Sequence, residues 1–435
     1  MMVELYMLLD RHDLEDRLAN SGCCLRCVER CAPFLDFACG EYQGEGNETK
    51  AISPNKINGV AHDSNSKLNG HSTHPSCFVC LDLLSERRLH DLIRYIKDQI
   101  KLANYESPHF VLSLVTVQIL EIRQVLLALW LKERFPSLSL MEFMDRCLPI
   151  KQLLKDDLCS HLPNALGLEY RTNSAFEVKV ETEAADTGFF NTLEKLDPDT
   201  FVMKTKRQQR AKKLPCQIFS RKSVLAFFSK NSTETLEGQF PFPSDPRSHN
   251  DVDKSNAQTD DDIFNYRVTL EHEPIFVGGR YNKYSRDLPQ TPWIVEGERL
   301  KESSIEELIV GPIDAQLRAD EFKFSSSGRE DIDVRCLGDG RPFIVECLNP
   351  RRVTLTEEEL RRVEDDINQG GGDKIRVTKM AMVSDREKAY LRKMENDKSK
   401  HYVAICHSLE KLTDHDMTKL KEVRDNLVHQ KTPLR

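Results

Sequence analysis

The segment SSSGREDIDVR carries the densest set of side chains able to do chemistry in this sequence. It places Glu330, Asp331 and Asp333 beside Arg329 and Arg335, in a polar turn that precedes an extended run. Arginines beside a carboxylate favour its charged form and lower its pKa below about 3.9. An ionised, positioned carboxylate can act as a nucleophile or a general base. The turn is therefore a candidate active site, although a surface salt-bridge cluster would use the same residues.

Two C-x-x-C pairs form a second group, Cys24 with Cys27 and Cys77 with Cys80. Each pair places two thiolates on one tight turn, and four thiolates at ~2.3 Å fill the tetrahedral shell of one zinc. The polar segment between the pairs can bulge outward, because loop closure costs only the logarithm of loop length. We expect a closed, structural zinc site, with reduced cysteines and no metal as the alternative. The competing ligands are Cys23, Cys31, His71 and His74.

The charge balance limits where nucleic acid could bind. The net charge is -8 and the pI about 6.0, so phosphate attraction must come from local basic patches. The run MKTKRQQRAKK at 203–213 is such a patch, or else a solvated helix or loop. No RRM or KH signature accompanies it.

Cysteine content and apolar patterning favour an intracellular protein. Thirteen cysteines in 435 residues are not a dense disulfide framework, and the first residues show no secretory signal. The most apolar stretch, 110–120, is too short to span a bilayer and is followed at once by Glu121 and Arg123. We therefore expect no membrane association, and residence in the nucleus, the cytoplasm or both.

Hydrophobic periodicity predicts an α+β fold, with paired strands and covering helices. We expect a loop at 43–72, a main linker at 229–262 rich in Pro and acidic residues, and a hairpin closed by the GDG turn at 338–340. The predicted helices are 1–20, 81–104, 122–134, 221–230, 303–319, 355–368, 384–394 and 415–427. The predicted strands are 109–120, 175–182, 264–273, 375–383 and 401–409.

Longer motifs resemble the Pus-ten family of tRNA pseudouridine synthases. They are GGRYNKYSRDLPQTPW, SSSGREDIDVRCLGDGRPF and QKTPLR, with looser similarity at GCCLRCV, SCFVCL and FSRKSV. The resemblance implies four regions: a zinc-binding region at 1–110 with a flexible loop at 43–72, a THUMP-like RNA-binding domain at 111–228, the linker, and a pseudouridine synthase domain at 263–435. The implied activity is isomerisation of uridine at position 54 or 55, in the TΨC arm of tRNA.

The resemblance also assigns roles to single residues. Asp331 follows Gly-Arg-Glu and corresponds to the catalytic aspartate, with Arg329 and Arg335 as partners for its charge or for a phosphate. The target base must leave the stack, so we expect Asp331 at the floor of a pocket. The isomerisation needs no organic cofactor, and we expect a monomer. The residues expected to line an RNA-facing loop, with simple packing as the alternative, are Arg280, Tyr281 and Lys283.

The family domain continues beyond QKTPLR, whereas this sequence stops at Arg435. The expectation is therefore a chain that lacks some active-site elements and is weakly active or inactive. The alternative function is a non-catalytic, zinc-stabilised RNA-binding protein. A generic adaptor with a zinc knuckle would explain the cysteines but not the SSSGREDIDVR turn.

Overall fold

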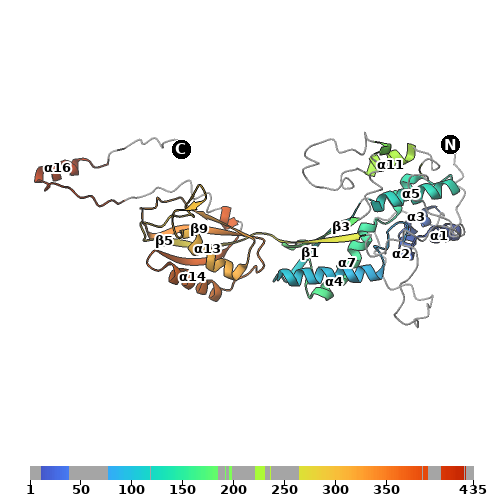
Figure 1. The fold of residues 1–435 in the computed structure, drawn as a ribbon, viewed down its shortest axis with the longest axis horizontal. Coiled ribbons are helices and arrows are strands. Elements are labelled where there is room, and N and C mark those ends of the chain that lie inside the picture. Colours follow the sequence, from blue (N-terminus) through green and yellow to red (C-terminus); the bar gives the residue numbers. More distant parts are fainter. Residues whose placement is uncertain are drawn as a thin grey trace.

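The computed structural model describes most of the chain as two lobes, which lie end to end in Figure 1. The described residues are 11–38, 77–117, 119–184, 221–230, 264–384, 386–389 and 403–425, with 192, 195–197, 236 and 427. The predicted loop at 43–72, the basic run at 203–213 and nearly all of the 229–262 linker lie outside them. None of the described helices combines the length and the apolar character needed to cross a membrane.

The first lobe packs helices beside a four-stranded sheet of order β2-β1-β3-β4. Its strands are β1 (His109–Val115), β2 (Glu169–Tyr170), β3 (Phe176–Ala184) and β4 (Phe264–His272). Strand β1 runs parallel to β2 and β3, and β4 pairs antiparallel with β3. The helices are α1 (Arg11–Asn20), α2 (Leu25–Glu29), α3 (Ala32–Ala38), α4 (Glu86–Ala103), α5 (Ile119–Arg134), α6 (Leu140–Arg146), α7 (Ile150–Leu166) and α11 (Arg221–Lys230).

Local sequence signals account for the ends of α4. The Ser85 side chain accepts a hydrogen bond from the Arg88 backbone N–H at the start, and Asn104 adopts the left-handed conformation at the end. One apolar face is buried between these ends, as the helical spacing predicts. The buried side chains are Leu89, Leu92, Ile96 and Ile100.

The domain boundaries differ from those predicted. A single contiguous apolar core runs from Leu18 to Leu236, so regions 1–110 and 111–228 share one lobe. Strand β4 was expected to open the catalytic domain at 263, but it completes the first lobe's sheet through β3. The second lobe therefore begins at β5 (Ile275–Lys283). Periodicity identified β4 as a strand, and long-range pairing decided its lobe.

The second lobe has an antiparallel sheet of order β10-β5-β9-β8. Its further strands are β6 (Ile294–Val295), β7 (Glu298–Arg299), β8 (Glu321–Ser326), β9 (Cys336–Leu348) and β10 (Ile375–Val383). Helices α13 (Ile305–Leu317) and α14 (Glu357–Gly371) share one apolar core with this sheet. The two lobes together confirm the predicted α+β class.

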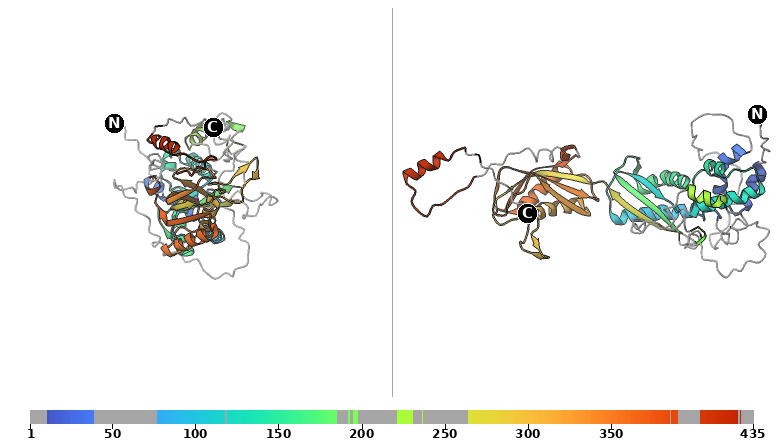
Figure 2. Two further views of the ribbon diagram at one scale, coloured as in Figure 1. Left: turned by 90° about the vertical axis from the view of Figure 1, so that its left-hand side faces the viewer. Right: turned by 90° about the horizontal axis from the view of Figure 1, so that it is seen from above.

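Two predicted elements of the second lobe are wrong. The GDG sequence does not close a hairpin, because β9 runs straight through it with a register shift against β5. Gly338 and Gly340 have positive φ angles of 71° and 75° there, which marks a bulge. Residues 403–409, expected as part of a strand at 401–409, are not strand; α16 (Asp414–Glu422) follows them. A short hairpin of β6 and β7 projects from the lobe (Figure 2).

A small polar junction joins the lobes. The Tyr105 hydroxyl lies 2.7 Å from Oδ1 of Asn349 and 3.0 Å from the Leu270 carbonyl oxygen. The backbone N–H of Glu106 donates to the Arg351 carbonyl at 2.7 Å, and the Glu106 carboxylate pairs with Arg318 and Arg352. The carboxylate of Glu106 is half-exposed, so this junction is open to solvent.

Candidate functional site

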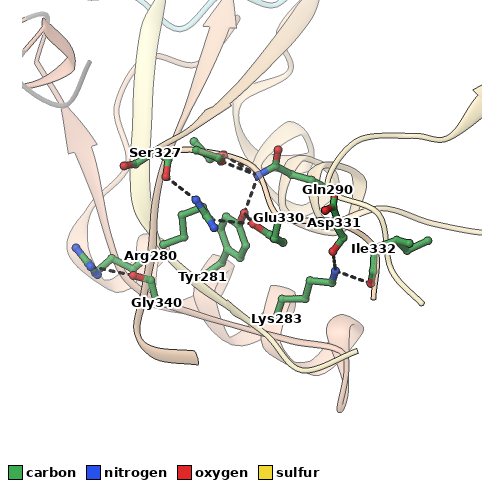
Figure 3. Close-up of polar contacts among 12 residues, drawn as sticks. Arg280, Tyr281, Lys283, Gln290, Ser327, Glu330, Asp331, Ile332 and Gly340 are labelled. Carbon is green, nitrogen blue, oxygen red and sulfur yellow. Dashed lines mark hydrogen bonds and ion pairs between the residues drawn. The ribbon is translucent and has the colours of Figure 1, made fainter. Parts of the chain in front are cut away.

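The turn between β8 and β9 carries Asp331, and side chains of the lobe hold its backbone from within (Figure 3). The ammonium of Lys283 donates to the carbonyl oxygens of Asp331 at 2.9 Å and Ile332 at 2.7 Å. Arg286 donates to the Asp333 carbonyl at 2.9 Å. Charged donors strengthen hydrogen bonds to carbonyl groups, so the backbone around Asp331 is fixed at successive residues.

Glu330 anchors the same turn from the interior of the lobe. Only 7% of it is exposed, and the Tyr281 hydroxyl lies 3.0 and 3.1 Å from its two carboxylate oxygens. Arg341 forms an ion pair with it at 2.9 Å between Nε and Oε2. Gln290 donates to the Tyr281 hydroxyl and to Ser326 Oγ, both at 2.7 Å. The buried carboxylate thus has both a cationic partner, Arg341, and a hydrogen-bond donor, Tyr281, as burial requires.

Burial shapes the titration of this network. Desolvation, followed by the negative charge of Glu330, raises the pKa of the Tyr281 phenol well above its usual range. Burial likewise lowers the pKa of the Lys283 ammonium. Tyr281 therefore stays a neutral donor toward Glu330 at neutral pH.

Asp331 itself points the other way. Its side chain is exposed, which corrects the expectation of a carboxylate at the floor of a pocket. Within the described part of the chain its carboxylate forms no hydrogen bond or ion pair, so the expected pairing with Arg329 or Arg335 is absent. Both arginines are exposed on the same turn. Within this turn Glu330 faces inward, whereas Asp331 faces solvent.

The three residues expected to line an RNA-facing loop lie in strand β5 instead. Tyr281 and Lys283 have no exposed surface, so the packing alternative describes them. Arg280 is half-buried and donates to the carbonyl oxygens of Asp339 at 2.7 Å and Gly340 at 2.8 Å. It therefore supports the bulge in β9. A Cβ at Gly340 would lie 3.0 Å from the Tyr281 carbonyl oxygen, which explains why glycine occupies this position.

Sequence reasoning gave no role to Glu330, Arg341 or Gln290. The available signal was the change from apolar to polar residues along FVGGRYNK, since polar side chains that a strand buries need partners. Which groups supply those partners depends on where β8, β9 and the loop after β5 meet.

The cysteine prediction is confirmed in its geometry. The four sulfur atoms of Cys24, Cys27, Cys77 and Cys80 lie within 4.8 Å of one another, and those of Cys24 and Cys80 are 3.6 Å apart. Tetrahedral bonds of ~2.3 Å to one zinc place sulfurs about 3.8 Å apart. Among the competing ligands, Cys23 is outside this group although buried. His71 and His74 lie outside the described residues.

Backbone contacts join the two C-x-x-C pairs. The N–H of Cys24 donates to the Cys77 sulfur at 3.3 Å, and the N–H of Phe78 donates to the Gly22 carbonyl at 2.8 Å. Hydrogen bonds from neighbouring thiols, Cys23 first, lower the pKa of the Cys77 thiol, whereas hydrogen bonding with Cys24 raises the pKa of the Cys27 and Cys80 thiols. Donors aimed at sulfur stabilise the thiolate that binds metal. The cluster could therefore hold one metal ion.

Comparison with known proteins matches both lobes. The family model described as Pus10, C-terminal matches residues 276–435, and that described as eukaryotic Pus10, N-terminal matches residues 77–257. The tRNA pseudouridine synthase Pus10 of Xenopus laevis is 32% identical over 443 residues, covering 96% of this chain and 81% of that protein. The Homo sapiens protein of the same name is 33% identical over 395 residues, covering 90% and 68%. The protein of that name from Thermofilum pendens is 39% identical over 170 residues, covering 39% and 38%.

Proposed function

The chain belongs to the Pus10 family, and from this premise we propose that it isomerises uridine to pseudouridine in tRNA, with Asp331 as the catalytic carboxylate. The observation that carries the proposal is the clamped turn. Three side chains, Lys283, Arg286 and Glu330, fix the backbone around Asp331 while its carboxylate remains exposed and unpartnered among the described residues. A fixed backbone with a free carboxylate favours reaction with an incoming substrate.

The reaction requires little beyond such a carboxylate. The C1′–N1 bond of uridine breaks, the uracil turns, and a C1′–C5 bond forms. The proton lost from C5 balances the proton gained at N1, so product and substrate are isomers. Asp331 would either add to C1′ and leave again, or abstract a sugar proton and return it. Both routes use the ionised carboxylate as nucleophile or base.

Exposure of Asp331 fits a substrate that completes the site. The target nucleotide leaves its stack at a cost of a few kcal/mol, and it would cover the carboxylate on arrival. The exposed Arg329 and Arg335 on the same turn are the proposed contacts for neighbouring phosphates. The proposed target is uridine 54 or 55 in the TΨC arm.

A pair of variants on one turn tests this proposal. Asp331→Asn keeps the side-chain shape and removes the charge, whereas Asp333→Asn makes the same change on an exposed neighbour. An unmodified tRNA transcript is incubated with each protein, and pseudouridine is mapped chemically. We expect Asp331→Asn to lose at least ~10²-fold in rate, the range for a positioned acid or base, and Asp333→Asn to stay near wild type.

Full activity in Asp331→Asn would overturn the assignment of this residue. Tight tRNA binding by the wild type without any product would instead support the alternative, a non-catalytic RNA-binding protein. Binding is measured separately, by the salt dependence of the tRNA affinity.

We further propose that the four cysteines bind one zinc ion. Four protein ligands fill the tetrahedral shell and leave no open position, so the metal would stabilise the fold of the first lobe. Metal analysis of purified protein should give one zinc per chain. Cys24→Ser and Cys77→Ser should lose it, whereas Cys159→Ser, a partly buried cysteine of the same lobe, should retain it. Unchanged zinc in the first two variants would exclude this ligand set.

A further inference from the structure

The first lobe contains a buried arginine without a carboxylate. Arg30 follows helix α2 directly, is 1% exposed, and is the bulkiest fully buried side chain of the described chain. Its Nη1 donates to Oε1 of Gln124 at 3.0 Å and to the Leu148 carbonyl at 2.9 Å. Its Nε and Nη2 are buried and have no hydrogen-bond partner among the described residues. No described carboxylate forms an ion pair with it.

A guanidinium stays charged under all ordinary conditions, so this arrangement needs a negative partner. Cys27 belongs to the four-cysteine cluster and lies in α2, three residues before Arg30. Arg30 continues α2 with helical backbone angles, so the two side chains lie one turn apart on the same face of the helix. Both residues are only 1% exposed, so the charged guanidinium is buried next to a cluster residue.

The net charge of the metal-loaded cluster makes it a candidate partner for Arg30. One divalent cation bound by four thiolates carries a net charge of two minus four, or −2, inside a buried site. An isolated buried charge of either sign is strongly unfavourable, so a cation beside this dianion stabilises both. We propose that Arg30 is the built-in counter-charge of the metal–thiolate centre. This inference rests on the proposed zinc site and assigns it a residue outside the ligand set.

The same side chain connects the metal to the rest of the lobe. Gln124 lies in α5 and is 5% exposed, and Leu148 lies in the connection between α6 and α7. Both contacts of Arg30 therefore reach elements that carry no metal ligand. Metal binding should therefore stabilise the packing of α5 and of the α6–α7 connection, as well as the two C-x-x-C pairs.

Zinc affinity of charge-matched variants tests the proposal. Arg30→Gln removes the charge but keeps a donor, Arg30→Lys keeps the charge, and Arg26→Gln removes a charge from a partly exposed ion pair of the same helix. Competition with a chromophoric chelator should show zinc binding weakened 10- to 100-fold in Arg30→Gln, the range for residues that support metal ligands. Arg30→Lys should lose less, and Arg26→Gln should match the wild type.

Thermal melts with and without zinc separate this role from ordinary packing. With zinc, Arg30→Gln should melt below the wild type. Without zinc it should be at least as stable, because it no longer buries an uncompensated charge. Cobalt-substituted protein adds a spectroscopic readout, since the sulfur-to-cobalt charge-transfer band should shift in Arg30→Gln and not in Arg26→Gln.

The outcomes distinguish the two proposals. Absence of any zinc from the wild type would remove the metal site itself. Zinc bound equally well by wild type and Arg30→Gln would overturn the role of Arg30 and leave the metal site in place. Equal destabilisation of the zinc-bound and zinc-free forms would also overturn it, because packing alone would then explain the residue. If Arg30→Gln does not fold, Arg30→Lys still decides: zinc affinity within a few-fold of the wild type supports a role through charge, and a loss of 10-fold or more contradicts it.

Discussion

The buried Arg30 of the first lobe and the partly buried Arg341 of the second each need an opposite charge, and the two lobes supply it differently. Arg341 in the second lobe contacts Glu330, so the opposite charge comes from the chain itself. Arg30 in the first lobe has no carboxylate partner among the described residues, and it lies one helical turn after the cluster residue Cys27. The second lobe can therefore fold around its own ion pair. The first lobe is expected to need a bound metal to complete its electrostatics.

The largest expected effect follows from removing the metal. Structural zinc sites contribute on the order of 10 kcal/mol to folding, so a strong chelator should loosen the first lobe. The second lobe contains no group matching this cluster among its described residues and should be unaffected. Hydrogen exchange followed by mass spectrometry should show lost protection in α2 and in residues 77–85, with β5 and β9 unchanged. Equal loss of protection in both lobes would break the comparison.

The next effect concerns the ion pair of the second lobe. Glu330→Gln leaves Arg341 without its carboxylate and should lower the free energy of unfolding by about 3 kcal/mol. This cost is at the low end of the range for removing one partner of a buried ion pair, because 15% of the Arg341 side chain remains exposed. Denaturant unfolding measures the change, with Asp339→Asn at an exposed position as the control. A double change, Glu330→Leu with Arg341→Met, should cost less than Glu330→Leu alone.

A smaller effect isolates the tyrosine. Tyr281→Phe removes the hydroxyl between Gln290 and Glu330 and should cost about 1–3 kcal/mol, the penalty for leaving a buried acceptor short of a donor. Tyr284→Phe, at a residue 37% exposed, is the matched control and should cost less than ~0.5 kcal/mol. If Tyr284→Phe lowered the free energy of unfolding as much as Tyr281→Phe does, both relative to the wild type, the role of the buried network would be contradicted.

The same variant has a pH signature. The pKa of Tyr281 is raised in the folded state above its unfolded value of about 10, so the folded protein holds a proton that the unfolded chain releases. Stability contributed by this group is present below pH ~10 and falls as the pH rises further. Tyr281→Phe should flatten that alkaline decline, measured as the free energy of unfolding between pH 8 and 11. An unchanged slope would show that other groups cause it.

The smallest effect belongs to the junction between the lobes. Glu106→Gln removes ion pairs with Arg318 and Arg352, but its carboxylate is 51% exposed. Solvent-exposed pairs contribute about 0–1 kcal/mol, so unfolding of either lobe should barely change. Added salt should reduce even this difference. A cost near that of Glu330→Gln would show that the junction stabilises the fold as strongly as the buried pair.

Local patterns predicted much of the architecture. Periodicity identified α4, α5, α13, α14 and β10 because each buries one face or alternates along its length. The C-x-x-C spacing identified the four clustered sulfurs, because each pair is fixed by a single turn. The GDG sequence was read as a hairpin turn, since a bulge and a turn use the same glycine conformations.

The sequence by itself determined the family, the α+β class and the cysteine cluster, because these depend on residue types over short spacings. Only the tertiary structure decided that β4 belongs to the first lobe and that Glu330, rather than Asp331, is the buried carboxylate of the turn. It alone also brought Arg341 to Glu330 and buried Arg30 without a carboxylate partner among the described residues. The physical reason is that burial and charge pairing depend on contacts between segments far apart along the chain, which no local pattern records.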